Sequence, residues 1–216
     1  MSHVASQFMD IIMCLLGGAC LYFCDEKALT GTLPIWMKEI KPTLFMAVPR
    51  VWEKMEEKLR EAFASKTRII NWVRGVTTPA LDSMLKGGSG GIRYAVAKKL
   101  VLKKVWAELG LDECIMHMYG AAPLPQKSRD FFFSLGIFLN GIYGMSETSG
   151  PMTATHTMFL SDYSSKACGS VVVGGEIKLE NPNQEGEGEV CFRARNCFMG
   201  YLKNEKATTG KKFPPK

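Results

Sequence analysis

Hydrophobic positions along the chain follow both helix and strand periods. After Pro49, the residues Val51, Met55, Leu59 and Phe63 recur every four positions, which predicts a long helix with one apolar stripe. Further helices are predicted over residues 3–16, 32–40, 92–109 and 125–135. Short apolar runs predict buried strands at residues 19–24, 43–48, 114–119 and 137–142. Because these strands alternate with helices, we expect an α/β fold with a mostly parallel sheet buried on both faces.

The pattern changes towards the end of the chain. Short strands are predicted at residues 171–173, 176–180 and 187–193. We therefore expect an α/β core over residues 1–155, a small β-rich subdomain over residues 156–207 and an unstructured tail over residues 208–216. Helical periodicity also fails over residues 75–91, where the glycine-rich run 87–91 lacks phosphate-loop spacing and indicates a linker or lid.

Composition excludes several classes of protein. The chain has 216 residues, of which 46% are hydrophobic and 22% charged, so it is neither a disordered tail, a collagen-like fibre nor a coiled coil. The net charge is +6, and a dense basic stretch contains Lys98, Lys99, Lys103 and Lys104. This stretch could favour anionic ligands or a membrane surface, although a solvated surface is the simpler interpretation. No nucleic-acid-binding pattern is present in the sequence.

Two further features of the sequence limit the possibilities. The apolar run over residues 8–24 is too short for a membrane span and is interrupted by Gly17 and Gly18, so a buried helix followed by a buried strand is expected. Seven cysteines without a C-x-x-C pair predict neither a disulfide framework nor a zinc site, which favours a reducing compartment.

The richest candidate chemistry follows the predicted strand over residues 137–142. Ligands of α/β sheets bind beyond the carboxyl ends of the strands. There, Gly144 would let the backbone approach a ligand, and the hydroxyls of Ser146 and Thr148 could donate to phosphate oxygens. Glu147 offers the hard oxygen ligand that Mg²⁺ prefers, and the ring of Tyr143 could stack on a base. A polar turn with a capping hydroxyl explains the same residues equally well.

A second loop follows the strand over residues 114–119. Its small residues Gly120, Ala121 and Ala122 would let a planar ligand lie against the backbone. Alone, the loop is better explained as an ordinary turn that leads into a helix. Two such loops, each at the end of a strand, could together line one cleft.

Five segments in order resemble motifs of the adenylate-forming superfamily, which includes acyl-CoA synthetases. YGMSETSG at residues 143–150 is similar to the family's YG-x-[ST]-E-[TS] signature, and YGAAPL at residues 119–124 to its G-A-[AP]-L loop. SHV at residues 2–4 resembles the end of its P-L-S-H motif, and GEGEVCFRARNCFMGYL at residues 186–202 its glycine-rich G-Y motif. TLFMAVPRVWEKM at residues 43–55 is similar to a segment of long-chain acyl-CoA synthetases. SETSGP, PRVWEKM and FMGYL together most resemble the bubblegum branch of long-chain fatty acid–CoA ligases. The resemblance covers residues 2–208.

The resemblance implies a two-step reaction in which ATP activates a long-chain fatty acid as acyl-adenylate and CoA then displaces AMP, with Mg²⁺ as the metal. It implies Glu147 as metal ligand, with Glu147 and Thr148 as catalytic residues. The implied nucleotide-binding residues are Tyr143, Gly144, Met145, Ser146, Glu147, Thr148, Gly120, Ala121 and Ala122. His3 would lie near the acyl pocket, or have no role in the site. The implied location is cytoplasmic, with peripheral contact at the endoplasmic reticulum membrane.

The sequence also departs from the family pattern. The phosphate loop would precede residue 2, and neither the T-G-D aspartate nor the lid-domain lysine is found among the 216 residues. We therefore expect an incomplete ligase chain with negligible turnover by itself. One alternative is a catalytically inactive truncated form that binds lipid or a partner protein. Another is a peptide-synthetase adenylation unit, against which the PRVWEKM segment argues.

Overall fold

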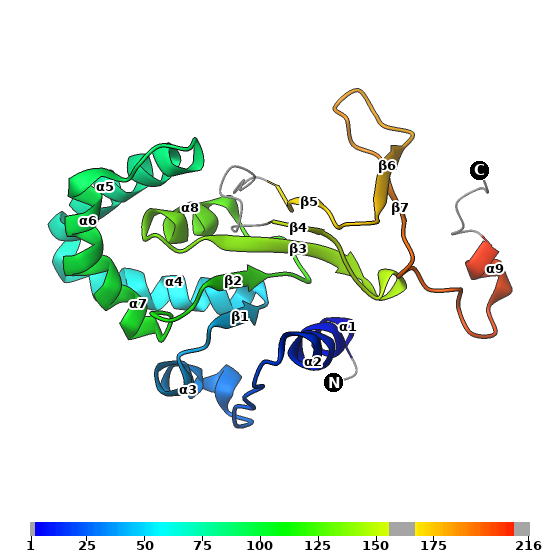
Figure 1. The fold of residues 1–216 in the computed structure, drawn as a ribbon, viewed down its shortest axis with the longest axis horizontal. Coiled ribbons are helices and arrows are strands. Elements are labelled where there is room, and N and C mark those ends of the chain that lie inside the picture. Colours follow the sequence, from blue (N-terminus) through cyan, green and yellow to red (C-terminus); the bar gives the residue numbers. More distant parts are fainter. Residues whose placement is uncertain (1–2, 156–166, 210–216) are drawn as a thin grey trace. The chain divides into compact units, whose positions relative to one another are not determined.

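The computed structural model describes residues 3–155 and 167–209 (Figure 1). Their contacts form two compact units. An α/β unit comprises Tyr22–Ile142 and Thr155–Gly169, and a second unit comprises Met1–Leu21, Tyr143–Ala154 and Ser170–Lys216. The strand β3 (Leu139–Met145) contributes its first residues to the α/β unit and its last to the second unit.

The α/β unit alternates helices with strands, as its periodicity predicts. Its helices are connected or continued by short turns. These are the 3-10 turns η2 (Ala28–Thr30) and η3 (Ala64–Lys66) and the π-helical turn η4 (Lys98–Leu102). The main elements, in chain order, are α3 (Leu33–Ile40), β1 (Leu44–Ala47), α4 (Pro49–Phe63), α5 (Thr67–Leu85), α6 (Gly91–Ala97), α7 (Lys103–Leu109), β2 (Met116–Tyr119) and α8 (Gln126–Ser134). The expected α/β fold is thus confirmed.

The sheet of this unit is parallel. Strand β2 pairs with β1 on one side, where Met118 lies opposite Met46, and with β3 on the other, where Met118 lies opposite Asn140. Parallel strands place their carboxyl ends at the same edge of a sheet. The loop after Tyr119 therefore leaves the edge at which α/β folds bind their ligands.

The core of the α/β unit is built around Trp52 on α4. The indole is fully buried and donates from Nε1 to the carbonyl oxygen of Met118 at 3.1 Å. Its ring lies edge-on to Phe45 of β1 and Phe132 of α8, with centroids 5.4 and 5.3 Å away. One side chain therefore joins two helices to the sheet, and its polar atom keeps a partner inside the core.

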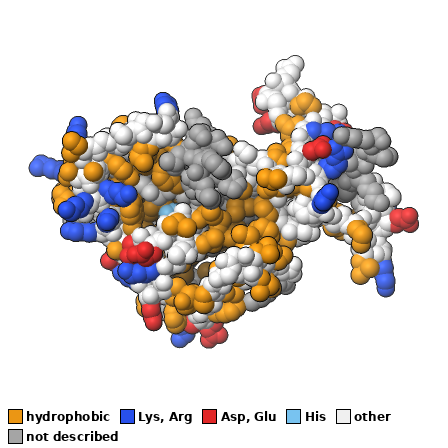
Figure 2. All heavy atoms as spheres, viewed as in Figure 1, with side chains coloured by type: hydrophobic (Ala, Val, Ile, Leu, Met, Phe, Trp, Pro, Cys, Tyr) orange, Lys and Arg blue, Asp and Glu red, His pale blue; other side chains and the backbone are white. Residues whose placement is uncertain are grey.

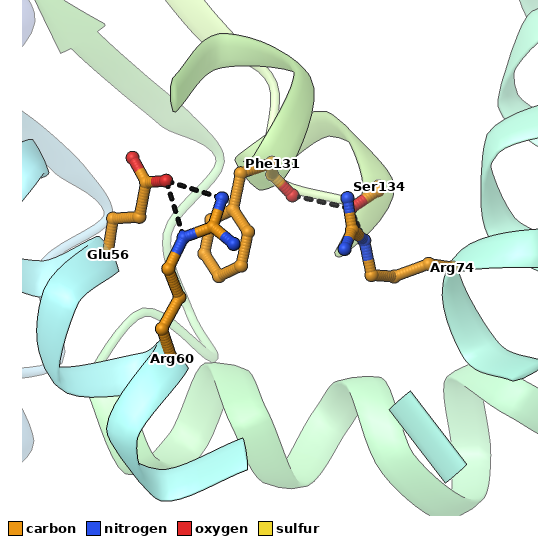
Figure 3. A network of polar contacts seen from close by, with 5 residues as sticks. All are labelled: Glu56, Arg60, Arg74, Phe131 and Ser134. Atoms are coloured by element: carbon orange, nitrogen blue, oxygen red, sulfur yellow. Dashed lines mark hydrogen bonds and ion pairs between the residues drawn. The ribbon is translucent and has the colours of Figure 1, made fainter. Parts of the chain in front are cut away.

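Two arginines and one aromatic ring connect α4, α5 and α8 (Figure 3). Arg60 bonds the buried carboxylate of Glu56 at 2.7–2.8 Å, and its guanidinium lies 4.4 Å from the ring centroid of Phe131. From α5, Arg74 donates to the Ser134 hydroxyl at 2.8 Å and lies 5.7 Å from the same ring. Glu56 and Arg60, four residues apart on α4, thus form an ion pair in which the carboxylate is buried.

The second unit contains a helical segment and short antiparallel strands. The segment runs through α1 (Val4–Ser6), η1 (Gln7–Ile12) and α2 (Met13–Gly17), and ends at Gly18 in a left-handed conformation. Strand β4 (Gly150–Ala154) pairs with β5 (Ser170–Val171), and β6 (Glu176–Glu180) forms a hairpin with β7 (Glu189–Arg193). The turn η5 (Ser146–Thr148) follows β3, and the helix α9 (Glu205–Thr209) lies near the end of the described chain.

Several expectations about local structure are wrong. Residues 19–24 form no strand, and Cys20, Tyr22 and Phe23 are exposed. The helical segment before them is also not buried, since Leu15 and Leu16 are about four-fifths exposed. Helix α5 continues through Gly75 to Leu85, where loss of the helical pattern was expected. Strand β3 extends through the expected loop to Met145, and β4 was not expected.

The observed units divide the chain differently from a boundary after residue 155. The helical segment at the start and the strands after residue 170 belong to the same unit. Of the expected tail, Thr208 and Thr209 lie in α9, and residues 210–216 are outside the described residues. None of the helices in the described parts is both long and apolar enough to cross a bilayer.

Candidate functional site

Thr148 closes the turn that follows β3. Its hydroxyl accepts a hydrogen bond from the N–H of Met145 at 3.2 Å and lies 2.9 and 2.7 Å from the carbonyl oxygens of Met145 and Gly150. The side chain is 4% exposed. A hydroxyl has one proton to donate, so these backbone groups take up the hydrogen bonds of the Thr148 side chain. In this structure Thr148 stabilises the turn, and its role as phosphate ligand stays a prediction.

Gly144 is required by backbone packing. A Cβ at this position would lie 2.3 Å from the carbonyl oxygen of Gly150 and 2.9 Å from Cα of Pro151. The close approach that the sequence led us to expect with a ligand is therefore made to β4. Tyr143 and Met145, on either side, are each 37% exposed, and Ser146 is also exposed. These side chains are thus accessible to a ligand.

The segment over residues 196–201 holds Glu147 in place. The hydroxyl of Tyr201 donates to Oε1 of Glu147 at 2.6 Å, and the N–H of Phe198 donates to the Glu147 carbonyl at 2.8 Å. In addition, Nδ2 of Asn196 donates to the Thr148 carbonyl at 2.6 Å. Three donors from one segment therefore fix both the backbone of the turn and one carboxylate oxygen.

Tyr201 is itself held on two sides. Its N–H donates to the Thr208 hydroxyl at 2.9 Å, and its ring lies edge-on to Phe198 with centroids 4.8 Å apart. The hydrogen bond to Glu147 is the main reason that the pKa of Tyr201 is raised above its usual range. The phenol therefore stays protonated at neutral pH and remains a donor to the carboxylate.

A hollow of about 440 Å³ opens beside this turn in the second unit. Its lining includes Met145, Glu147, Met152, Phe192, Tyr201 and Thr208. The volume falls within the range of small-molecule sites. Apolar walls alternate there with charged side chains, since Glu180, Glu189, Lys178 and Arg193 also line the hollow. Sequence reasoning assigned no role to Asn196, Phe198 or Tyr201, although GYL at residues 200–202 was part of a quoted motif and could have pointed to them.

The loop after β2 belongs to the α/β unit. Gly120 is buried, and a Cβ there would lie 3.1 Å from the carbonyl oxygen of Ile142. Ala121 has a φ of 69°, which side chains rarely adopt, and both Ala121 and Ala122 are exposed. Such backbone strain is frequent at functional loops. The expectation that this loop and the Glu147 turn line one cleft stays a prediction.

His3 has a local role in the structure. Its Nδ1 accepts from the N–H of Ala5 at 3.1 Å, so His3 caps the first turn of α1. The side chain is exposed. The predicted position near an acyl pocket is therefore not supported by any contact that the structure describes, and it stays a prediction.

The residues at the turn fit a magnesium ion that is held mainly by its substrate. Within residues 3–155 and 167–209, no three His, Cys, Asp or Glu side chains cluster as a complete set of metal ligands. Mg²⁺ is usually bound by one or two carboxylates together with substrate phosphates. Glu147 beside an open hollow can supply the one carboxylate that such a site needs.

Comparison with known proteins reveals close relatives. The chain is 42% identical to the long-chain-fatty-acid–CoA ligase ACSBG2 of Xenopus laevis, an alignment that covers 96% of this chain and 28% of that protein. It is 41% identical to the Mus musculus enzyme of the same name, over 96% of this chain and 32% of that enzyme. The chain thus spans about three tenths of the length of these relatives. The predicted resemblance to bubblegum-type ligases is confirmed.

Solved structures support the fold. The adenylation domain of a carboxylic acid reductase from Segniliparus rugosus, in complex with AMP and a carboxylic acid, matches with a TM-score of 0.60 and 20% identity, covering 97% of this chain and 29% of that chain. MatB from Rhodopseudomonas palustris matches with a TM-score of 0.58 and 17% identity, covering 96% and 33%. At this identity the likeness concerns the fold alone.

A family model provides the assignment itself. The model described as AMP-binding enzyme matches residues 1–202, which is nearly the whole of the chain. The matched range contains the Glu147 turn, the loop after β2 and the segment that holds Glu147. The chain therefore belongs to the AMP-binding enzyme family.

Proposed function

We propose that this chain is part of a long-chain fatty acid–CoA ligase, located in the cytoplasm, and that its turn over residues 143–148 binds the magnesium complex of ATP. The observation that carries the proposal is the Glu147 carboxylate, which Tyr201 and the backbone of Phe198 hold at the wall of a hollow of about 440 Å³. The family assignment and the long-chain ligase relatives support the same activity.

In the proposed reaction, a carboxylate oxygen of the fatty acid attacks the α-phosphorus of ATP, and the bond to pyrophosphate breaks. The CoA thiolate then attacks the acyl carbonyl carbon, and AMP leaves with the electron pair of the broken C–O bond. Magnesium, when bound, neutralises the charge on the phosphates as the two anions meet. CoA is proposed as co-substrate because the relatives are CoA ligases.

The residues of this chain would bind and orient the substrates. Glu147 would hold the metal in the position that the Tyr201 hydroxyl fixes, and the exposed Ser146 would donate to a phosphate oxygen. Tyr143 would stack on the adenine, since its ring is accessible. Fixing a carboxylate in advance lowers the cost of reorganisation when the nucleotide binds.

Calorimetric titration tests this function. We expect the chain to bind a non-hydrolysable palmitoyl-adenylate analogue more tightly than it binds palmitate or AMP alone, because the analogue occupies both subsites. Binding of palmitate with no effect of the nucleotide portion would instead favour a lipid-binding module. Fatty-acid-dependent release of pyrophosphate by these 216 residues is expected to be negligible.

A further inference from the structure

One helical face of the α/β unit is both apolar and exposed. Helices α6 and α7 continue one another through η4, over residues 91–109. Ile92, Val96 and Leu100 are 84%, 43% and 56% exposed, and their four-residue spacing places them on one side. The opposite side packs into the core through buried residues such as Leu102 and Val105. The exposed stripe is thus not part of the core of its own unit.

Basic side chains flank this stripe. Arg93, Lys99, Lys103 and Lys104 are all exposed, and none of them forms an ion pair with any residue in the described ranges 3–155 and 167–209. The helix has one acidic residue, Glu108, which pairs with Lys38 at 2.5 Å. Figure 2 shows Lys and Arg side chains gathered around hydrophobic atoms at the left of the view, where these helices lie. We call these residues, together with the stripe, the α6–α7 face.

We propose that the α6–α7 face docks on an anionic lipid bilayer. A helix with an apolar stripe and flanking lysines lies in the plane of a membrane, with the stripe among the acyl chains and the ammonium groups at the phosphates. Four positive charges around the stripe, none of them in an ion pair within the described parts of the chain, match a negatively charged surface of headgroups better than they match a mixed protein surface. This inference is independent of the proposed ligase chemistry.

Sedimentation with vesicles measures the proposed contact. The full chain would be mixed with vesicles of phosphatidylcholine alone and of phosphatidylcholine with phosphatidylserine, an anionic lipid that attracts polybasic segments. We expect binding to the phosphatidylserine vesicles, weakened at high salt because the charges are exposed. Equal binding to both kinds of vesicle, or no binding to either, would overturn the proposal.

A charge-reversal pair locates the contact on the molecule. The double variant Lys99→Glu, Lys103→Glu should lower partitioning onto the phosphatidylserine vesicles at least about 30-fold, because loss of each lysine costs about fivefold and the new carboxylates are repelled by the surface. The matched control is Lys54→Glu, Lys58→Glu, which makes the same charge change at exposed positions of α4. The control should partition several-fold more strongly than the first variant. An equal loss in both pairs would mean that overall charge attracts the chain, and would contradict docking through this face.

Serine substitutions test the apolar part of the face. Ile92→Ser, Val96→Ser, Leu100→Ser should weaken vesicle binding, whereas serine at the exposed Leu29 and Ile35 should leave it unchanged. Circular dichroism would verify that each variant is folded. If the triple variant does not fold, the charge-reversal pair alone tests the proposal. If the triple serine variant loses a dimer that the wild-type chain forms, and still binds vesicles, a second copy of the chain covers the face and the proposal is contradicted.

Discussion

The Tyr201 hydroxyl is the most specific residue-level feature of the site, because it fixes one oxygen of Glu147. Tyr201→Phe removes this donor and keeps the ring against Phe198. We expect Mg·ATP affinity to fall roughly tenfold, as is typical when a group that orients a metal ligand is lost. Calorimetric titration would measure it, with Tyr22→Phe at an exposed position as control. Unchanged affinity in Tyr201→Phe would show that the hydroxyl does not position Glu147 for the metal.

His117 should make stability depend on pH. Burial lowers its pKa from 6.5 to about 4, and its Nε2 has no hydrogen-bond partner among the described residues. Below pH 6.5 the unfolded chain takes up a proton that the folded chain does not. This contribution to stability is therefore complete above pH 6.5 and is lost as the pH falls through 4, with a loss of up to about 3 kcal/mol.

Urea unfolding between pH 7 and pH 4 would measure this contribution. His117→Phe keeps a ring beside Trp52 and should flatten the dependence, whereas replacement of the exposed His3 by Asn should leave it in place. If the two variants lose stability equally as the pH falls, the burial of His117 is not the cause.

Residue types in the sequence indicated the chemistry of the turn but not its internal contacts. Glu147 was predicted as a ligand from its type and position after a strand, and it does line a hollow. Thr148 and Gly144 were assigned to the nucleotide, yet their closest contacts are to the backbone of the turn and of β4. Tyr201 is 54 residues away from Glu147, and no local pattern reveals a hydrogen bond over that separation.

At the scale of elements, two glycines should respond in opposite ways to alanine. Gly75 lies inside α5 with nothing within 4 Å of a Cβ, so Gly75→Ala should stabilise the chain by about 0.5–1 kcal/mol. Gly110 ends α7 at a φ of 68°, and a Cβ there would lie 2.2 Å from the carbonyl carbon of Met37. Gly110→Ala should destabilise by more than about 1 kcal/mol.

Thermal unfolding of both variants measures this difference. Similar midpoints for Gly75→Ala and Gly110→Ala would contradict the assigned conformations of the two glycines. The comparison is direct because both changes add a single methyl group, and only the backbone conformation and the available space differ.

Helix and strand periods predicted most elements, and they failed where packing overrides local preference. Residues of α5 include Gly75 and Pro79, which usually interrupt a helix, but Thr77, Ala80 and Leu81 are buried and hold it against its neighbours. Residues 19–24 are as apolar as a buried strand, yet no strand pairs with them within the described residues. Apolarity marks a segment for burial but does not supply the neighbour that a strand needs.

At the scale of the molecule, the division into units could not be derived from the sequence. The second unit collects segments from the start, the middle and the end of the chain, so its contacts are non-local. A change in composition after residue 155 identifies where short strands begin but not which segments pack together. The family, in contrast, could be recognised from five ordered motifs that are spread over residues 2–202, and the family model matches nearly the same range.

The central claim is that the turn over residues 143–148 binds magnesium-complexed nucleotide through Glu147. Calorimetric titration of Mg·ATP into the wild-type chain and Glu147→Gln tests it most directly, with Glu57→Gln on the exposed side of α4 as control. We predict Mg²⁺-dependent, saturable binding by the wild type and the control, and an affinity roughly 10- to 100-fold lower for Glu147→Gln. Equal affinities of the wild type and Glu147→Gln, or ATP binding that is indifferent to Mg²⁺, would contradict the claim.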